Sequence, residues 1–212
     1  GRLILPLLIK SPFKIKIIGD KSLSRRDFSR VIDPLNKIGV KFFPKGKKRL
    51  PISILGSNYL RPIDYYEKKG SAQCKTCVML ASLNTPGEMR IFAKRSRDHT
   101  ELMFKNLKMP ISVKKKGEID FIKTSRPDKF NSFNVDIPGD ISSSAFFIAL
   151  TLLSKNSYLV LKNINLNPSR LGIIKILNKM GASIKTKNIK LNKGEKCGDI
   201  IVKSNKKLKA IN

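Results

Sequence analysis

The 212-residue sequence is poor in acidic, aromatic and cysteine residues. It has 15 acidic residues against 44 lysines and arginines, no tryptophan, and 7% aromatic residues. The longest apolar runs, Ala145–Leu150 and the pair after Thr151, are much shorter than the roughly 20 residues of a membrane-spanning helix. The first residues carry no cleavable leader. We therefore expect no membrane association, although Gly1 is not an initiator residue and a targeting segment upstream of it stays open.

The positive charge is large and spread along the whole chain. A net charge of +29 is typical of nucleic-acid-binding proteins. However, the lysines are not gathered in one arm, and no aromatic stripe interleaves with them as single-strand binders require. We expect a solvated lysine-rich surface that attracts small anions, with no nucleic-acid partner. The alternative is a non-enzymatic basic protein, which would bind nucleic acid with a steep salt dependence.

The cysteines favour a structural role. Three cysteines without a regular framework indicate a reducing compartment, and we expect a cytoplasmic protein. Cys74 and Cys77 form one CxxC pair, but no second pair follows and His99 is the only histidine, so we expect no metal site. With Val78 and Ala81, the two cysteines have helical spacing. They are predicted to lie on the buried stripe of a helix.

The sequence repeats with a period of 71 residues. Ser71 and Ser142 each open a predicted helix, and they lie 71 residues apart. Other helices end at the same interval, at Gly39, Pro110 and Gly181. A period of this length indicates supersecondary units that share a core. The chain holds almost three such units.

Each unit is predicted to contain helices that alternate with strands. The first helices are expected at roughly 2–10, 71–83 and 142–154, and the second helices at roughly 27–38, 99–108 and 169–180. The predicted strands are Lys14–Ile18, Glu88–Lys94, Tyr158–Lys162, Ile52–Leu55, Ile63–Tyr66, Ile119–Ile122, Val135–Ile137 and Asp199–Val202. This order predicts an α/β fold.

Polar residues gather where the predicted helices begin, and helix N-termini bind anions through free N–H groups. Three segments have this character: Gly70–Gln73, Ser96–Glu101 and Ser24–Asp27. The alternative for Ser71 is a simple N-cap, and the alternative for the arginines of the third segment is a solvated pair of charges. Spacing alone favours the simple N-cap at Ser71 and leaves both interpretations of the arginines open.

Five segments of this sequence resemble motifs of the EPSP synthase family, in the family's order. Ser71-Ala72-Gln73-x-Lys75 is similar to its Ser-Ala-Gln-x-Lys motif, and its Ser-Arg-Asp-His-Thr-Glu segment is present unchanged from Ser96 to Glu101. The others are Gly19-Asp20-x-Ser22-Leu23-x-x-Arg26, Pro138-Gly139-Asp140-x-Ser142-Ser143 and Asn167-Pro168-Ser169-Arg170. The form with alanine between serine and glutamine resembles the second bacterial class of the family.

The resemblance implies a fold of repeated βαβαββ units, the enolpyruvyl transferase fold or inside-out α/β barrel, here incomplete. Two domains of three units each are implied, with helix N-termini aimed at the cleft between them. Residues 1–137 would be about two units of the first domain. Residues 138–212 would be the first, truncated unit of the second.

The resemblance also implies an activity. The family transfers the enolpyruvyl group of phosphoenolpyruvate to the 5-hydroxyl of shikimate 3-phosphate, giving EPSP and phosphate, without metal or cofactor. Carried over, Ser71, Ala72, Gln73, Ser96 and Arg97 would bind shikimate 3-phosphate. Arg26 and Gln73 would bind phosphoenolpyruvate. The complete protein is expected to be a monomer whose partners are these small anions.

The sequence departs from the family at one arginine and lacks the reacting groups. Asp27 follows Arg26 where the family often has proline, and its carboxylate either weakens anion binding at Arg26 or caps the next helix. The resemblance implies that the candidates for catalytic acid and base lie outside residues 1–212, so we expect no turnover by this chain alone. A sister enzyme of the same fold, which transfers enolpyruvyl to UDP-N-acetylglucosamine, is the nearest enzymatic alternative.

Overall fold

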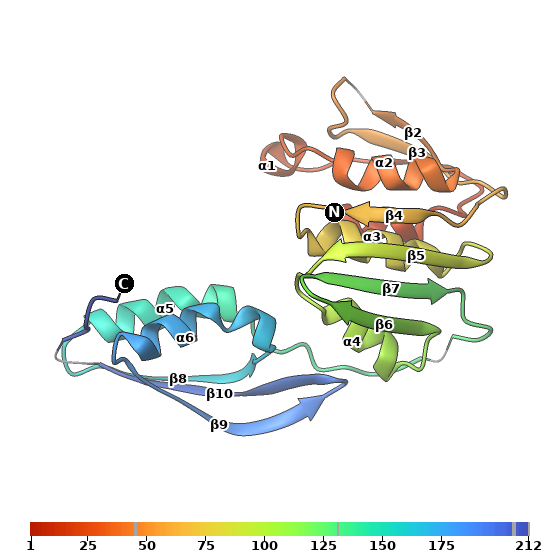
Figure 1. The fold of residues 1–212 in the computed structure, drawn as a ribbon. Helices are drawn as coiled ribbons and strands as arrows, with labels where there is room; N and C mark the ends of the chain where they lie inside the picture. The colour runs from red at the N-terminus through yellow and green to blue at the C-terminus, as the bar shows by residue number, and fades with distance from the viewer. Residues whose placement is uncertain (45, 131, 205–206, 212) are drawn as a thin grey trace. The chain divides into compact units, whose positions relative to one another are not determined.

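The computed structural model describes residues 1–44, 46–130, 132–204 and 207–211, and its helices and strands fall into two compact units. The first unit comprises residues 1–96 and 107–130, and the second comprises residues 97–106 and 131–212. Figure 1 labels most of the helices and strands of both. Among the described residues, no helix is long and apolar enough to cross a membrane.

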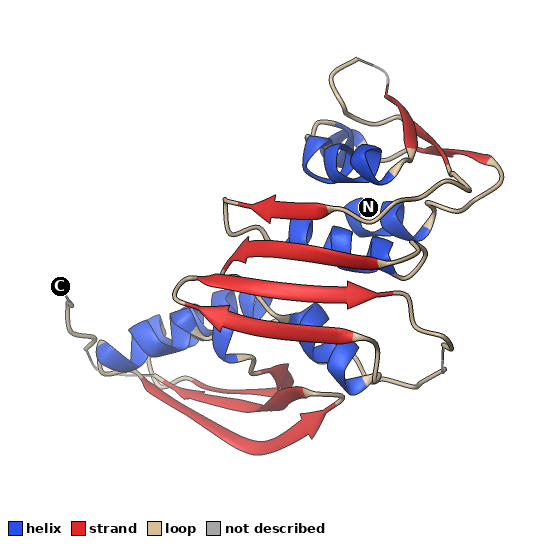
Figure 2. Ribbon diagram, turned by 45° about the vertical axis from the view of Figure 1, so that its right-hand side comes forward, coloured by secondary structure: helices blue, strands red, loops and turns tan. Residues whose placement is uncertain are grey.

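The first unit contains two sheets. Its elements are η1 (Arg2–Leu7), β1 (Lys14–Ile17), α1 (Lys21–Ser24), α2 (Ser29–Ile38), β2 (Lys41–Pro44), β3 (Ile52–Leu55), β4 (Asp64–Glu67), α3 (Ala72–Ser82), β5 (Glu88–Lys94), β6 (Ile111–Lys116) and β7 (Ile119–Ser125). One sheet has the order β1-β3-β2, and the other has the order β4-β5-β7-β6. In Figure 2 the four strands of the larger sheet run side by side, and α3 packs against β4, β5 and β7.

The second unit contains one sheet. Its elements are α4 (His99–Asn106), α5 (Ile141–Leu153), β8 (Tyr158–Asn165), η2 (Pro168–Arg170), α6 (Gly172–Lys179), β9 (Ser183–Asn192) and β10 (Glu195–Lys203). The sheet has the order β8-β10-β9, with α5 against β8 and β10 and α6 against β9. Apolar residues from both layers, among them Ile148, Leu152 and Ile200, form its core.

The same strand order recurs in all three sheets, which confirms the repeat. The antiparallel triplets β1-β3-β2, β5-β7-β6 and β8-β10-β9 each place the last strand of a unit in the middle. In the middle copy of the repeat, β4 adds a parallel strand beside β5. The elements from β4 to β7 therefore follow the βαβαββ order along the chain, as the resemblance implied.

Two sequence-based assignments need correction. No strand forms at Val135–Ile137; instead, one parallel bridge joins Gly139 to Ile164, held by backbone hydrogen bonds of 2.8 and 2.9 Å to Asn163 and Asn165. The segment predicted as a first helix is a 3-10 helix that ends at Leu7 and contains Pro6, which has no N–H to donate.

The strong helical patterns are confirmed. On α2 the predicted stripe is buried at Val31, Ile32 and Leu35, and the helix ends at Gly39, whose φ of 114° is a left-handed conformation that glycine adopts readily. The structure also shows three strands that the sequence did not indicate: β2, β6 and β9.

Helices α3 and α5 bury different faces, although they occupy equivalent places in the repeat. Met79 of α3 is fully buried, and the residue one period later, Leu150 of α5, is 63% exposed. Ser82 and Leu153 form a second such pair, with 0% and 79% exposure. Helix α3 has η1 and α2 as neighbours in addition to its own sheet, and this accounts for the extra burial.

All three cysteines are free and buried, so we expect them to react slowly with thiol reagents. The pKa of the Cys77 thiol is raised mainly by burial and to a smaller extent by the neighbouring Cys74. Almost no thiolate is therefore present at neutral pH. Labelling with a disulfide reagent should be slow in buffer and should reach three equivalents in denaturant. Fast labelling of the native chain would contradict this burial.

Candidate functional site

The turn before α3 is held by a buried carboxylate. Glu67 ends β4, and its two side-chain oxygens accept hydrogen bonds from the backbone N–H groups of Lys69 (3.1 Å) and Ser71 (2.9 Å). Gly70 lies between them with a φ of 69°, which a residue with a side chain adopts only with strain. The path of the chain into α3 is therefore fixed by Glu67, which sequence reasoning missed.

Ser71 and Gln73 have different roles at the start of α3. The Ser71 hydroxyl accepts a hydrogen bond from the backbone N–H of Cys74 at 3.4 Å, which confirms that it caps the helix. Ala72 is the first residue of the helix. Gln73 is half-buried, and its side-chain oxygen accepts a hydrogen bond from Arg2 at 2.9 Å.

Arg2 joins the beginnings of three helices. It is the first residue of η1, its Nη1 donates to Gln73 in α3, and its Nη2 donates to the backbone oxygen of Asp27, just before α2, at 2.6 Å. Its guanidinium carbon lies 5.6 Å from the centre of the buried Phe28 ring. Sequence reasoning did not select Arg2, although its separation from Gln73 equals the period of 71 residues.

Arg26 and Asp27 lie between α1 and α2. The Arg26 side chain is exposed, as anion binding requires. The Asp27 carboxylate accepts hydrogen bonds from the Ser29 hydroxyl (2.6 Å) and the Ser29 backbone N–H (2.8 Å). Both hydrogen bonds lower the pKa of Asp27, and the one from the hydroxyl has the larger effect. The acidic neighbour of Arg26 is thus engaged with the start of α2.

Ser96 and Arg97 follow strand β5. The Ser96 hydroxyl is buried and has no hydrogen-bond partner among the described residues. The end of β5 lies against the turn before α3, since a Cβ placed on Gly70 would be 3.7 Å from the backbone oxygen of Arg95. Arg97 is exposed and is the first residue of the second unit's α4 segment.

In the second unit, the α4 segment is tied to the sheet by side-chain hydrogen bonds. The Asn167 amide donates to Asp98 at 2.9 Å, and His99 Nδ1 lies 2.7 Å from Glu195 Oε1. The other Glu195 oxygen accepts from the Asn165 amide. Two of the motif segments therefore meet here, and the contacts of His99 are structural.

At the start of α5, the segment that contains Arg170 also meets a further motif segment, Pro138–Ser143. The Asp140 carboxylate caps α5 by accepting from the backbone N–H groups of Ser142 (3.2 Å) and Ser143 (3.3 Å), and Arg170 Nη2 donates to it at 2.7 Å. Burial opposes ionisation of this carboxyl, but the Ser142 hydrogen bond and the Arg170 charge outweigh it. The pKa of Asp140 therefore lies below its usual value.

We expect Asp140→Ala to lower the free energy of unfolding of the second unit by about 1 kcal/mol, because two helix N–H groups lose their acceptor. Asp140→Asn should cost less, because it keeps the cap. The extra stability from the charge is fully present above the unfolded pKa of 3.8 and is lost as the pH falls from there through the lower pKa of the folded state. Urea unfolding of the unmodified chain and both variants near pH 7 and near pH 3 measures this. The difference in free energy of unfolding between the unmodified chain and Asp140→Asn should be smaller near pH 3, and an equal difference at both pH values would contradict the prediction.

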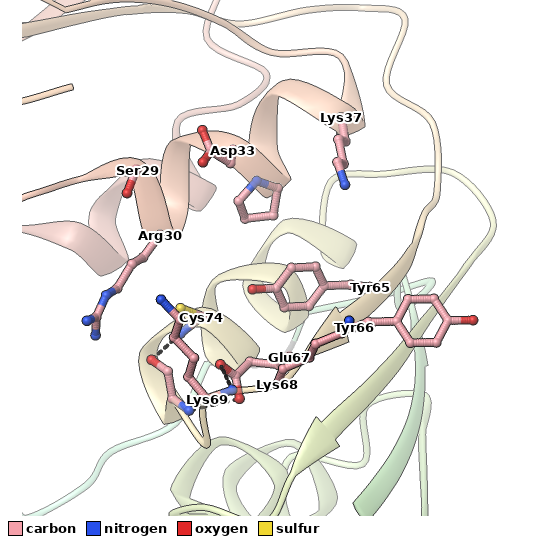
Figure 3. Close-up of a pocket in the computed structure, with 12 residues that line it drawn as sticks. Ser29, Arg30, Asp33, Lys37, Tyr65, Tyr66, Glu67, Lys68, Lys69 and Cys74 are labelled. Carbon is pink, nitrogen blue, oxygen red and sulfur yellow. Dashed lines mark hydrogen bonds between the residues drawn. The ribbon is translucent and has the colours of Figure 1, made fainter. Parts of the chain in front are cut away.

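A pocket of about 320 Å³ opens in the first unit between α2, β4 and the turn before α3 (Figure 3). It includes Ser71 but neither Gln73 nor Arg26. Tyr65 is one of the residues that line it, and the pKa of its phenol is raised mainly by burial and also by the adjacent Cys74. No group of three or more metal-ligating side chains occurs in the described part of the chain.

Comparison with known proteins agrees with this arrangement. The sequence model of the family described as EPSP synthase (3-phosphoshikimate 1-carboxyvinyltransferase) matches residues 1–212. The 3-phosphoshikimate 1-carboxyvinyltransferase of Petrotoga mobilis is 40% identical over 96% of this chain and 47% of its own, and that of Bacillus subtilis is 37% identical over 99% and 48%.

Solved structures give the same result. The EPSP synthase structure from Acinetobacter baumannii superimposes with a TM-score of 0.81 and 34% identity, over 100% of this chain and 47% of that one. The enolpyruvyl transferase NikO from Streptomyces tendae has a TM-score of 0.64 at 14% identity, which shows a shared fold. The chain spans about half the length of the curated relatives it matches. It belongs to the EPSP synthase (3-phosphoshikimate 1-carboxyvinyltransferase) family.

Proposed function

We propose that this chain forms part of a 3-phosphoshikimate 1-carboxyvinyltransferase, which transfers the enolpyruvyl group of phosphoenolpyruvate to the 5-hydroxyl of shikimate 3-phosphate and releases phosphate. The observation that carries the proposal is the meeting of three helix beginnings at Arg2, beside Gln73 and the loop that holds Arg26. Free N–H groups and guanidinium groups suit two anionic substrates.

The proposed binding residues divide by substrate. Ser71, Ala72 and Gln73, with Ser96 and Arg97, bind shikimate 3-phosphate. The buried Ser96 hydroxyl has no partner among the described residues, which supports a ligand contact there. Gln73 and Arg26 bind phosphoenolpyruvate, and the engagement of Asp27 with Ser29 leaves the Arg26 charge available.

The reaction proceeds by addition of the 5-hydroxyl to phosphoenolpyruvate and elimination of phosphate from the tetrahedral intermediate, with no metal or cofactor. Residues 1–137 belong to the first domain and residues 138–212 to the second. The complete protein is a cytoplasmic monomer. The groups that act as acid and base come from outside these 212 residues, so the chain alone binds substrate without turning it over.

Titration calorimetry tests the proposal with shikimate 3-phosphate, UDP-N-acetylglucosamine and duplex DNA as ligands, at physiological salt. We expect saturable binding of shikimate 3-phosphate, weakened about tenfold or more by Arg97→Ala, because a charged hydrogen bond to phosphate is lost. Phosphate release from phosphoenolpyruvate and shikimate 3-phosphate should be absent. Binding of only UDP-N-acetylglucosamine or only DNA would overturn the proposed substrate. Turnover by this chain would overturn the statement that its acid and base come from elsewhere.

A further inference from the structure

We propose that Arg2 is a positioning residue that fixes the direction in which the Gln73 amide faces, an inference that rests on the proposed function. The amide of glutamine carries one acceptor oxygen and two N–H donors. Arg2 Nη1 donates to the oxygen at 2.9 Å. A guanidinium group has no acceptor, so the amide cannot turn over without losing this hydrogen bond.

The orientation of the Gln73 amide decides whether it attracts or repels an anionic ligand. With its oxygen held by Arg2, Gln73 offers its two N–H donors to a ligand. Both proposed substrates are anions and need donors. If the amide were free to rotate, half of its orientations would present the oxygen to an anionic group, with repulsion in place of a hydrogen bond.

Arg2 is itself held in place from two sides. Its Nη2 donates to the backbone oxygen of Asp27 at 2.6 Å, and its guanidinium carbon lies 5.6 Å from the centre of the Phe28 ring. Phe28 is fully buried, so this ring is a fixed platform. The arginine therefore also links Gln73 to the residue that follows Arg26, and it connects the two proposed substrate-binding segments.

The direct test is possible because Gln73 is the only glutamine among the 212 residues. A chain labelled with ¹⁵N only in its glutamine side chain gives a single NH₂ pair in the NMR spectrum. In the unmodified chain we expect the two proton shifts to differ from those of a free glutamine side chain. Arg2→Met should move the pair to the values of a free glutamine side chain, and Arg2→Lys, which keeps one donor, should move it part of the way.

Arg61→Met is the matched control, because Arg61 also donates to a backbone oxygen, that of Lys37, at the far end of α2. It should leave the Gln73 pair unchanged. Circular dichroism and the backbone amide spectrum confirm that each variant is folded. An unchanged NH₂ pair in folded Arg2→Met, or an equal change in Arg61→Met, would overturn the proposal.

Binding separates this proposal from the proposed function. Arg2→Met should weaken shikimate 3-phosphate roughly tenfold, and the double variant Arg2→Met/Gln73→Ala should bind no more weakly than Gln73→Ala alone. Additive losses would show that Arg2 does not act through Gln73. If shikimate 3-phosphate fails to bind the unmodified chain, the proposed function fails, and the NMR result decides the role of Arg2 independently.

Discussion

Met79→Glu should unfold the first unit, whereas Leu150→Glu, one repeat period later, should leave the second unit folded. Met79 is fully buried between α3 and its neighbours, and Leu150 is 63% exposed. A carboxylate at position 79 would lose its hydration without gaining a partner. The expected cost of at least about 4 kcal/mol is a large share of the roughly 5–15 kcal/mol by which domains are stable. The change at Leu150 should cost less than about 0.5 kcal/mol.

Hydrogen exchange read by mass spectrometry measures the two units separately. Backbone amides of α3 and β5 should lose protection in Met79→Glu while those of β8 and β10 keep it. In Leu150→Glu all four elements should remain as protected as in the unmodified chain. Equal loss of protection in the two variants would show that the equivalent faces of α3 and α5 are packed alike, contrary to their burial.

Glu67→Ala should lower the free energy of unfolding of the first unit by about 3 kcal/mol, because two backbone N–H groups lose a charged acceptor inside the protein. Glu67 is 6% exposed and accepts from both Lys69 and Ser71. Shikimate 3-phosphate binding should weaken as well, since the turn that presents Ser71 loses its support. Glu67→Gln keeps one acceptor oxygen, so its free energy of unfolding should lie between those of the unmodified chain and Glu67→Ala.

Urea unfolding and calorimetry of the same variants provide the measurement. Glu88→Ala is the control, because the Glu88 side chain is 49% exposed and makes a surface ion pair with Lys123 at 3.0 Å. Its effect should stay within about 0.5 kcal/mol. If Glu67→Ala is no less stable than Glu88→Ala, the carboxylate does not hold the turn.

The sequence predicted those elements whose side chains carry the signal. Helix α2 has apolar residues at helical spacing and a glycine at its end, and both features reappear in the structure. Strands β2, β6 and β9 were missed because β2 is only four residues long, and β6 and β9 each carry three exposed lysines. Backbone pairing with a neighbour creates such strands, and no alternation of apolar residues marks them.

Helix-start chemistry predicted where Ser71 and Gln73 lie in the fold, but it missed the residues that support them. Ser71 and Gln73 begin a helix, as helix-start chemistry indicated. Glu67 could not be found in this way, because its importance comes from two backbone groups that the turn at Gly70 brings to it. Arg2 could have been found only by extending the repeat to Gln73 and asking what occupies the equivalent position.

The hydrogen bond between Arg2 and Gln73 joins residues that hold the same place in successive copies of the repeat. In a perfectly symmetrical array, such a contact would pair a residue with its own copy. Two arginines there would repel each other, and two glutamines would leave the contact without charge. An arginine at this contact therefore requires the copies to differ, so the imperfection of the repeat, more than the repeat itself, makes a charged site at the meeting point of the helices.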